Sequence, residues 1–244
     1  MDISHVHRWS LKTKITVLIL LIFLFSMWAL ALMASKITRT EMTEMLGQQQ
    51  FATTSMQAKD LNSDLIEMKE KLEKISLLIS ADLMRHPQGI QEIVENRYEA
   101  LSRFNAGIFI TDKEGTAVAS MPVSRNRMGM NFIDRDFIAK ALAENQSVIG
   151  RPMRGKLLPN PLIGMAAPIR DRDGRVIGLV AGVINLGEPN FMDHFTDYPY
   201  GKTGGYLILM PEESLIITAT NKSRIMTQLP PGSQDELYKR FNQG

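Results

Sequence analysis

The sequence contains no cysteine in its 244 residues. Disulfide bonds, thiolate metal sites and a cysteine nucleophile are therefore excluded. A strong excess of one charge is missing too, because 28 Lys and Arg stand against 26 Asp and Glu, and the formal net charge is only +2. Nucleic-acid binding requires a broad basic surface, so this balance argues against a nucleic-acid partner.

Motifs for catalysis and for cofactor binding are also missing. Gly201-Lys202-Thr203 resembles part of a phosphate-binding loop, but the glycine required five residues earlier is Thr196. The Asp171-Arg-Asp-Gly174 segment has too few ligands for a calcium loop and predicts a hairpin turn instead. No serine lies in a nucleophile elbow, and the scattered histidines lack metal-ligand spacing. We therefore expect no enzymatic activity, no metal and no cofactor in this chain.

A long run without charged residues extends from Ile15 to Ala34. As a helix, these 20 residues would be about 30 Å long, which matches the hydrocarbon core of a bilayer. The residues before the run are basic, whereas those after it are mixed in charge. They are Lys12 and Lys14 before it, and Lys36, Arg39, Glu41 and Glu44 after it. The positive-inside rule then predicts a cytoplasmic N-terminus at residues 1–14 and a transmembrane helix at 15–34.

A cleaved signal peptide is the alternative interpretation of this run. Ala29-Leu30-Ala31 resembles a cleavage site. However, the run is longer than the apolar core of about 7–15 residues that is usual in signal peptides. We therefore expect an uncleaved anchor.

After the anchor, apolar residues recur with the spacing of a heptad repeat. Gly and Pro are absent from residues 48–86, and Pro87 and Gly89 follow, so we expect a long helix over residues 35–85. The apolar seam could join the helix to a second copy of the chain in a parallel homodimer, or it could pack on its own domain. Both alternatives stay open from the sequence. The seam consists of Leu61, Leu65, Met68, Leu72, Ile75 and Ile79.

The middle of the chain predicts an α+β domain with an antiparallel five-strand meander. Two of its strand connections are Asp-x-x-Gly turns, at 112–115 and 171–174, which favour tight hairpins. Helices that precede a set of antiparallel strands are typical of an α+β fold. The expected helices are 91–102 and 134–145, and the expected strands are 107–112, 116–122, 147–153, 162–170 and 176–186.

The C-terminal part predicts the beginning of a second unit of the same kind. After a linker at 187–205, residues 206–210 and 215–220 predict another hairpin, and 235–241 predict a helix. No further strands follow, and an incomplete sheet would leave an open edge. We therefore expect the natural architecture to be longer than this chain.

The order of these elements resembles the double Cache sensor family of bacterial transmembrane receptors, over about residues 35–244. Four phrases carry the resemblance together, by their order and spacing. They are Phe109-Ile-Thr-Asp-Lys-Glu-Gly115, Gly129-Met-Asn-Phe-Ile-Asp-Arg-Asp-Phe137, Met165-Ala-Ala-Pro-Ile-Arg-Asp-Arg-Asp-Gly174 and Gly201-Lys-Thr-Gly-Gly-Tyr-Leu-Ile-Leu209.

The resemblance implies a PAS-like sensor, anchored in the bacterial inner membrane, that binds a small molecule in the periplasm. Residues 35–102 would form the signalling helix and a short second helix, 103–187 the membrane-distal Cache sheet domain, and 188–244 a linker with an incomplete membrane-proximal Cache unit. The output domain would be a diguanylate cyclase, which we favour, or a histidine kinase. A membrane-tethered scaffold that binds protein and no small ligand is the competing hypothesis.

The resemblance also assigns ligand-binding positions. In amino-acid-binding members of the family, an arginine at the position of Arg135 holds the ligand carboxylate, and two aromatics enclose the ligand. Phe137 matches the first aromatic, whereas Ile138 replaces the second. The acidic residue that holds the ligand amine falls near Val183, where this chain has no acid. An anion or a carboxylate without an amine is therefore the expected ligand. The alternative for Arg135 is a surface ion pair with Asp134 or Asp136.

Two further candidates come from the third and fourth expected strands. Arg151, with Arg154 and Lys156 nearby, could form a basic rim that attracts an anion, or a solvated loop. Met165 lies among small residues that could leave room for a ligand, or could equally admit a packed helix.

Overall fold

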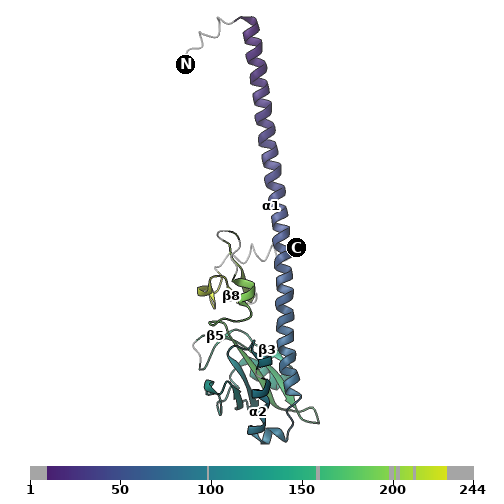
Figure 1. The fold of residues 1–244 in the computed structure, drawn as a ribbon, viewed down its shortest axis with the longest axis vertical. Coiled ribbons are helices and arrows are strands. Elements are labelled where there is room, and N and C mark those ends of the chain that lie inside the picture. Colours follow the sequence, from purple (N-terminus) through teal and green to yellow (C-terminus); the bar gives the residue numbers. More distant parts are fainter. Residues whose placement is uncertain are drawn as a thin grey trace. The chain divides into compact units, whose positions relative to one another are not determined.

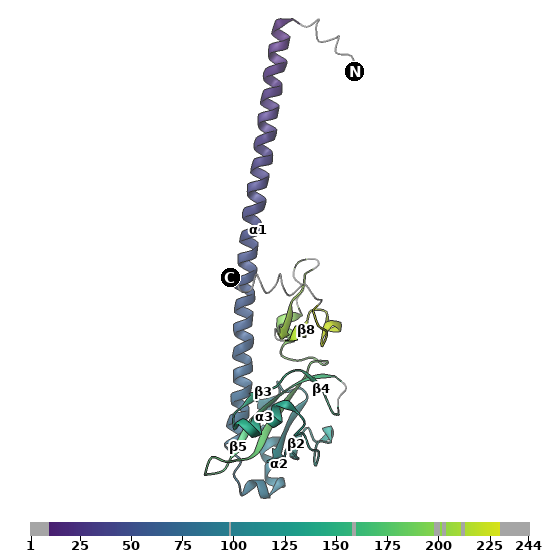
Figure 2. The ribbon, with the colours of Figure 1, turned by 180° about the vertical axis from the view of Figure 1, so that it is seen from behind.

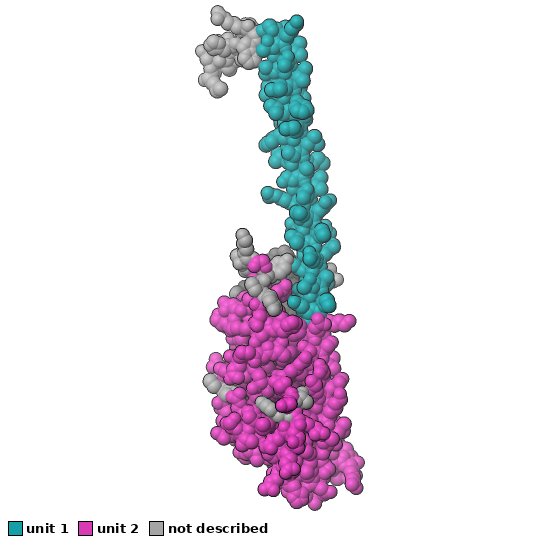
Figure 3. Space-filling view, in the orientation of Figure 1, with its two compact units in different colours: residues 1–58 teal, residues 59–244 magenta. Residues whose placement is uncertain are grey.

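The computed structural model describes residues 10–97, 99–157, 160–197, 201, 204–210 and 213–229. The chain divides into two compact units, residues 1–58 and residues 59–244 (Figure 3). The predicted α+β class is confirmed, with a long N-terminal helix and an antiparallel sheet.

Helix α1 extends from Leu11 to Ser76. Within the first unit its residues 15–34 are exposed, apart from the half-buried Val17. Among the described residues, α1 is the one helix that is long and apolar enough to cross a membrane. Exposed apolar side chains over such a length are typical of a segment surrounded by lipid.

The predicted end of the long helix at residue 85 is wrong, because α1 ends at Ser76. After Ser76 the hydrogen-bond pattern changes from that of an α-helix to that of a 3-10 turn. The backbone N–H groups of Leu78 and Ile79 donate to the carbonyls three residues earlier. This turn buries Ile79, whereas Leu77 is exposed. A 3-10 helix, η2 (Leu83–Arg85), follows.

Pro87 starts the next helix, α2 (Pro87–Arg97), which the sequence placed at 91–102. Proline is well tolerated in a first helical turn because its missing N–H would have no helical partner there. A further 3-10 helix, η3 (Glu99–Leu101), leads to the sheet.

The central sheet contains β1 (Gly107–Asp112), β2 (Ala117–Met121), β3 (Val148–Ile149), β4 (Met153–Arg154), β5 (Pro161–Arg170) and β6 (Val176–Asn185). All of its strand pairs are antiparallel, and its order is β2-β1-β6-β5-β3, with β4 also paired to β5. The predicted meander is therefore wrong, since the last strand β6 lies between β1 and β5. The expected strand at 147–153 is divided into β3 and β4 at Gly150, Arg151 and Pro152. Pro152 cannot donate a ladder hydrogen bond, which favours this break.

The two predicted Asp-x-x-Gly turns are confirmed, and they lie at the same end of the sheet. The Asp112 carboxylate accepts the backbone N–H groups of Glu114 and Thr116, and the Asp171 carboxylate does the same for Asp173 and Arg175. The backbone N–H and the guanidinium of Arg175 lower the pKa of the Asp171 carboxyl. The left-handed backbone that each turn needs is supplied by its glycine, with φ of 84° and 78°.

The two faces of the sheet are covered by different helices (Figures 1 and 2). Alternate strand residues point to opposite faces, so each face has its own apolar cluster. The α1 face comprises Ile108, Ile110, Ile163, Met165, Ala167, Val180 and Ile184, packed with Met68, Leu72 and Ile75 of α1 and Ile90 and Val94 of α2. The α3 face comprises Phe109, Ala166, Leu179, Ala181 and Val183, packed with Phe137, Ile138 and Ala141 of α3 (Asp136–Glu144).

The apolar seam of α1 is therefore taken up largely by the chain's own core. Met68, Leu72, Ile75 and Ile79 are buried there, and Leu61 and Leu65 pack against it partly buried. Of the two alternatives left by the sequence, packing on its own domain holds for this seam. Its buried residues are not available to a second copy of the chain.

A separate two-stranded sheet follows, formed by β7 (Leu207–Met210) and β8 (Leu215–Ala219). The predicted second hairpin is thus confirmed. Its strand β8 contacts two short helices, α4 (Asp193–Thr196) and η6 (Lys222–Arg224). Another short helix, η4 (Val123–Arg125), follows β2 in the central sheet. The helix predicted at 235–241 lies outside the described residues.

Candidate functional site

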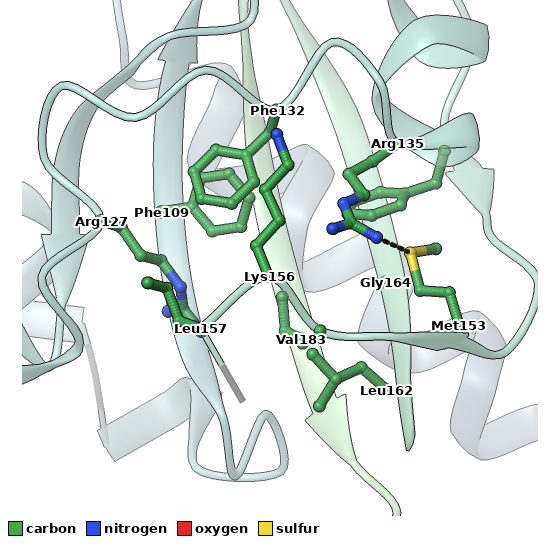
Figure 4. A pocket seen from close by; sticks show the side chains of 12 residues that line it. Phe109, Arg127, Phe132, Arg135, Met153, Lys156, Leu157, Leu162, Gly164 and Val183 are labelled. Atoms are coloured by element: carbon green, nitrogen blue, oxygen red, sulfur yellow. Dashed lines mark hydrogen bonds between the residues drawn. The ribbon is translucent and has the colours of Figure 1, made fainter. Parts of the chain in front are cut away.

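A pocket lies on the α3 face of the sheet, between α3, the strands and the loop that follows β4 (Figure 4). Its open space is ≈ 40 Å³. The walls are mainly apolar, three lining side chains are cationic, and none of the described residues that line it is Asp or Glu. The lining consists of Phe109, Arg127, Phe132, Arg135, Phe137, Met153, Gly155, Lys156, Leu157, Leu162, Gly164 and Val183.

Arg135 enters the pocket from the N-cap of α3. Its backbone is extended, with φ −87° and ψ 126°, and its carbonyl accepts the first helical N–H bonds. Its side chain is 20% exposed, and Nη1 donates to the Arg154 carbonyl at 2.9 Å and reaches the Met153 sulfur at 3.8 Å. Nε lies 3.8 Å from the Asp134 carboxylate. The guanidinium is thus positioned by neutral groups, with one carboxylate at the limit of ion-pair distance.

Phe137 forms one wall of the pocket, and two glycines make room for it. A Cβ on Gly164 would lie 2.4 Å from the Phe137 ring, and a Cβ on Gly150 would lie 2.7 Å from its Cβ. The small residue at Gly164 therefore admits the helix, and the pocket fills the remaining space beside the ring.

Val183 lies on β6 directly opposite Gly164 of β5 and is 5% exposed. It lines the pocket with Leu162, so this wall is apolar. A ligand amine would meet no negative charge at Val183.

Arg127 is a lining residue that the sequence gave no reason to select. It is only 5% exposed, its Nη2 donates to the Ala106 carbonyl at 2.7 Å, and its guanidinium lies 5.3 Å from the centre of the Phe109 ring. It follows Asn126, whose left-handed backbone (φ 50°) ends η4. In the sequence, Arg125-Asn-Arg127 is indistinguishable from an ordinary polar turn.

Lys156 connects the loop after β4 to the segment before α3. Its Nζ lies 2.6 Å from the Asp134 carboxylate, donates to the Asn131 carbonyl at 2.7 Å, and lies 5.5 Å from the centre of the Phe132 ring. The hydrogen bond from Lys156, together with the charges of Lys156 and Arg135, holds the pKa of Asp134 below its ordinary value, although burial opposes this. The sequence pattern indicated Lys156 only as a neighbour of Arg151.

The sequence model of the family described as Cache domain matches residues 34–241. The chain belongs to the Cache domain family. No protein among the curated sequences matches it.

Solved structures of similar fold include ligand-binding proteins and the ligand-binding domains of chemoreceptors. One is an extracellular ligand binding receptor from Desulfohalobium retbaense, with a TM-score of 0.51 and 16% identity over 72% of this chain and 33% of that chain. Another is the ligand-binding domain of the Pseudomonas aeruginosa amino acid chemoreceptor PctC in complex with GABA. Its TM-score is 0.54, with 15% identity over 72% of this chain and 76% of that chain. A third is the ligand-binding domain of the Pseudomonas fluorescens chemoreceptor CtaA in complex with L-serine. Its TM-score is 0.55, with 18% identity over 75% of this chain and 74% of that chain.

At these identities the likeness shows the Cache fold. The chain spans a third of the length of the first of these proteins, and about three quarters of the other two domains.

Two of the site residues predicted from the sequence lie away from this Cache pocket. Arg151 is 59% exposed and forms an ion pair of 2.8 Å with Glu213, next to the second hairpin. Met165 is fully buried in the cluster of the α1 face, because it alternates with Gly164 along β5. Of the five predicted residues, Arg135, Phe137 and Val183 come together at the pocket, whereas Arg151 and Met165 do not.

A second, wider space of ≈ 490 Å³ lies where the Cache sheet meets α4 and η6. Its lysine, Lys222, is already paired with Asp193 and, at 3.2 Å, with Asp197. Three acids, Glu188, Asp193 and Asp197, line this space beside the one lysine, whereas the charged residues that line the α3-face pocket are Arg127, Arg135 and Lys156.

Proposed function

We propose that this chain is the signal-input region of a receptor in the bacterial inner membrane, and that its Cache domain senses a small anion in the periplasm. The observation that carries the proposal is the pocket on the α3 face, in which Arg135 faces apolar walls. A scaffold that binds only protein has no need of such a pocket. PctC and CtaA, which share the fold, were solved with small molecules bound.

The chemistry of the pocket favours a carboxylate or another anion without an amine. A planar guanidinium such as that of Arg135 can form two parallel hydrogen bonds to a carboxylate, and low exposure strengthens them. Phe137 and Val183 supply apolar contacts for the rest of the ligand. An amino group would be brought close to the cations of the pocket without a described lining carboxylate to offset its charge.

Signal transmission in this proposal passes through the sheet. On β6, Val183 lines the pocket, whereas the next residue, Ile184, packs in the cluster that contains Leu72 of α1. A ligand that binds one arrangement of the sheet more tightly shifts the population toward it. Because the interior is close-packed, α1 would then adjust its packing on the other face.

The proposed organisation keeps the boundaries expected from the sequence. Residues 1–14 are cytoplasmic, 15–34 span the membrane, 35–102 form the signalling helix and a short second helix, 103–187 bind the ligand, and 188–244 form a linker and a second Cache unit. The output is a diguanylate cyclase or a histidine kinase. A homodimer through α1 stays a prediction, and it would use a face of the helix other than the buried seam.

The test is ligand-dependent thermal stabilisation of the full chain in detergent micelles. The panel contains small carboxylates, amines and uncharged aromatics. We expect carboxylates alone to raise Tm, since a ligand that binds only the folded state stabilises it. Arg135→Gln should remove this shift, whereas Arg151→Gln, the same change at the exposed arginine, should retain it. The proposal fails if no carboxylate raises Tm, or if Arg135→Gln retains the full shift.

A further inference from the structure

The three cations that line the pocket differ in how far they are already engaged within the fold. Arg127 is 5% exposed and donates to the Ala106 carbonyl at 2.7 Å. Lys156 is paired with the Asp134 carboxylate at 2.6 Å. Both cations therefore have partners of their own, and the ligand is left to be recognised by Arg135.

Arg135 retains hydrogen-bonding capacity. Its Nη1 donates to the Arg154 carbonyl, whereas Nη2 donates to none of the residues that the structure describes. Nε lies 3.8 Å from the Asp134 carboxylate, which is longer than a hydrogen bond. Nε and Nη2 form one edge of the guanidinium, and such an edge matches the two oxygens of a single carboxylate. In Figure 4 this guanidinium points into the pocket.

The floor of the pocket is apolar and belongs to the two central strands, β5 and β6. Val183 faces Gly164 across the strand pair, and Leu162 lies on the same face of β5. The Phe137 ring covers Gly164, since a Cβ there would lie 2.4 Å from it. Both strands are hydrogen-bonded to a neighbour on each side, so the floor has little freedom to recede for a longer ligand.

The open space above this floor is small. Its ≈ 40 Å³ accommodates about three water molecules, at about 10–15 Å³ for each. Acetate or propionate has a comparable size, whereas further methylene groups would press on Val183 or Leu162. The Arg135 side chain is 20% exposed, so solvent reaches it, and a ligand of this size needs no change in the fold.

We propose that the ligand is a short monocarboxylate of the size of acetate or propionate, an inference that rests on the proposed function. Arg135 binds its carboxylate, and its methyl or ethyl group packs against Val183 and Leu162. These two side chains determine the chain length that the pocket accepts.

The experiment is a calorimetric titration of the full chain in detergent micelles, at neutral pH and constant ionic strength. Acetate, propionate, butyrate and valerate form the series, and succinate tests whether a second carboxylate is accepted. We expect acetate or propionate to bind most tightly and valerate at least about tenfold more weakly, because the floor would be overpacked. On an unrestricted apolar surface, each added methylene would instead strengthen binding about fourfold.

Variants of the floor test its role in selecting chain length. Val183→Ala opens the floor and should strengthen the binding of valerate, relative to propionate, at least about tenfold. Val180→Ala is the matched control, because Val180 is buried on the same strand but belongs to the cluster of the α1 face. It should lower stability similarly and keep the order of the series.

Leu162→Ala provides a second enlargement, at a residue that is only partly buried and whose truncation costs the fold less. It should also shift the preference toward butyrate or valerate. Arg135→Gln should weaken the binding of every acid in the series.

Affinity that rises with chain length, or tighter binding of succinate than of any monocarboxylate, would overturn the short-chain inference and leave the proposed function standing. An unchanged order of affinities in both Val183→Ala and Leu162→Ala would overturn the role of the floor. If no acid binds, the proposed function itself fails.

Discussion

The two faces of the central sheet are built from the same strands and differ in what covers them. On the α1 face, Met68, Leu72, Ile90 and Val94 are fully buried in one apolar cluster. On the α3 face, a helix of 9 residues covers part of the sheet, and cationic side chains line the space beside it. One face is therefore suited to holding the fold together, and the other to exchanging a ligand with solvent.

Because successive residues of a strand point to opposite faces, residues important for stability alternate with residues that line the pocket. Gly164 and Val183 face the pocket, whereas Met165 and Ile184 belong to the α1 cluster. A substitution on one face should therefore mainly affect stability, and one on the other should also affect binding. The three predictions below test this separation.

The largest effect is expected from Leu72→Ala on the α1 face. Leu72 has 0% exposure in the core, so its truncation leaves a cavity and should lower the free energy of unfolding by about 2–5 kcal/mol. Leu77→Ala is the matched control, because Leu77 is 82% exposed and should change stability by less than about 0.5 kcal/mol. Denaturant unfolding of the full chain in micelles measures both. If Leu72→Ala and Leu77→Ala lower the free energy of unfolding by similar amounts, the burial of Leu72 does not stabilise the fold.

A smaller effect is expected from Gly164→Ala on the α3 face. Its Cβ would lie 2.4 Å from the Phe137 ring, and such overpacking should cost about 1–3 kcal/mol. Displacement of Phe137 should also weaken ligand binding. Gly182→Ala places a Cβ 2.5 Å from the Phe104 ring on the α1 face, so it should destabilise the fold similarly.

The two glycine variants are compared by titrating each with the carboxylate that stabilises the wild-type chain most. We expect Gly182→Ala to keep the affinity within about twofold, a difference well under 1 kcal/mol. If both variants lose affinity to the same extent, the two faces are not separable.

The smallest effect concerns the ion pair at the rim of the pocket. The pKa of Asp134 is lowered in the folded state, so its contribution to stability is present above the ordinary aspartate pKa of about 3.9 and is lost as the pH falls through the folded value. Asp134 is 54% exposed, so the contribution should stay below about 1 kcal/mol. The stability difference between the wild type and Asp134→Asn should be constant from pH 7 to about 5, and shrink below pH 4.

Lys156→Gln provides the control for this pH dependence, through a double-mutant cycle. In the Lys156→Gln background, Asp134→Asn should have little effect at any pH. A pH-dependent difference that persists without Lys156 would assign the effect to another partner of Asp134.

The sequence predicts what local chemistry determines. Apolar strand segments joined by Asp-x-x-Gly turns placed β1, β2, β5 and β6 correctly, and the position of Arg135 at the start of α3 was also correct. The order of the strands was missed because the pairing of β1 with β6 is a long-range contact that no local signal reports. The end of α1 was missed because tertiary packing of Ile79, and not proline, ends the helix.

The same distinction explains the candidate site. Phe137 and Val183 lie on regular elements, and Arg135 directly precedes α3. All three were identified through family resemblance, and the structure places them together. Arg127 and Lys156 lie on irregular segments, and only the tertiary fold brings them to the pocket. Met165 was selected for its small neighbours, but the alternation of β5 directs it to the opposite face.

The two Asp-x-x-Gly turns close the end of the sheet that lies away from the pocket. At the turn end, four backbone N–H groups are tied to two aspartates, and Gly178 of β6 lies against Met84. The pocket is farther along the strands, where Val183 faces Gly164 and the Lys156 loop closes the opening. The two turns thus hold the strands in register without contributing any residue to the lining of the pocket.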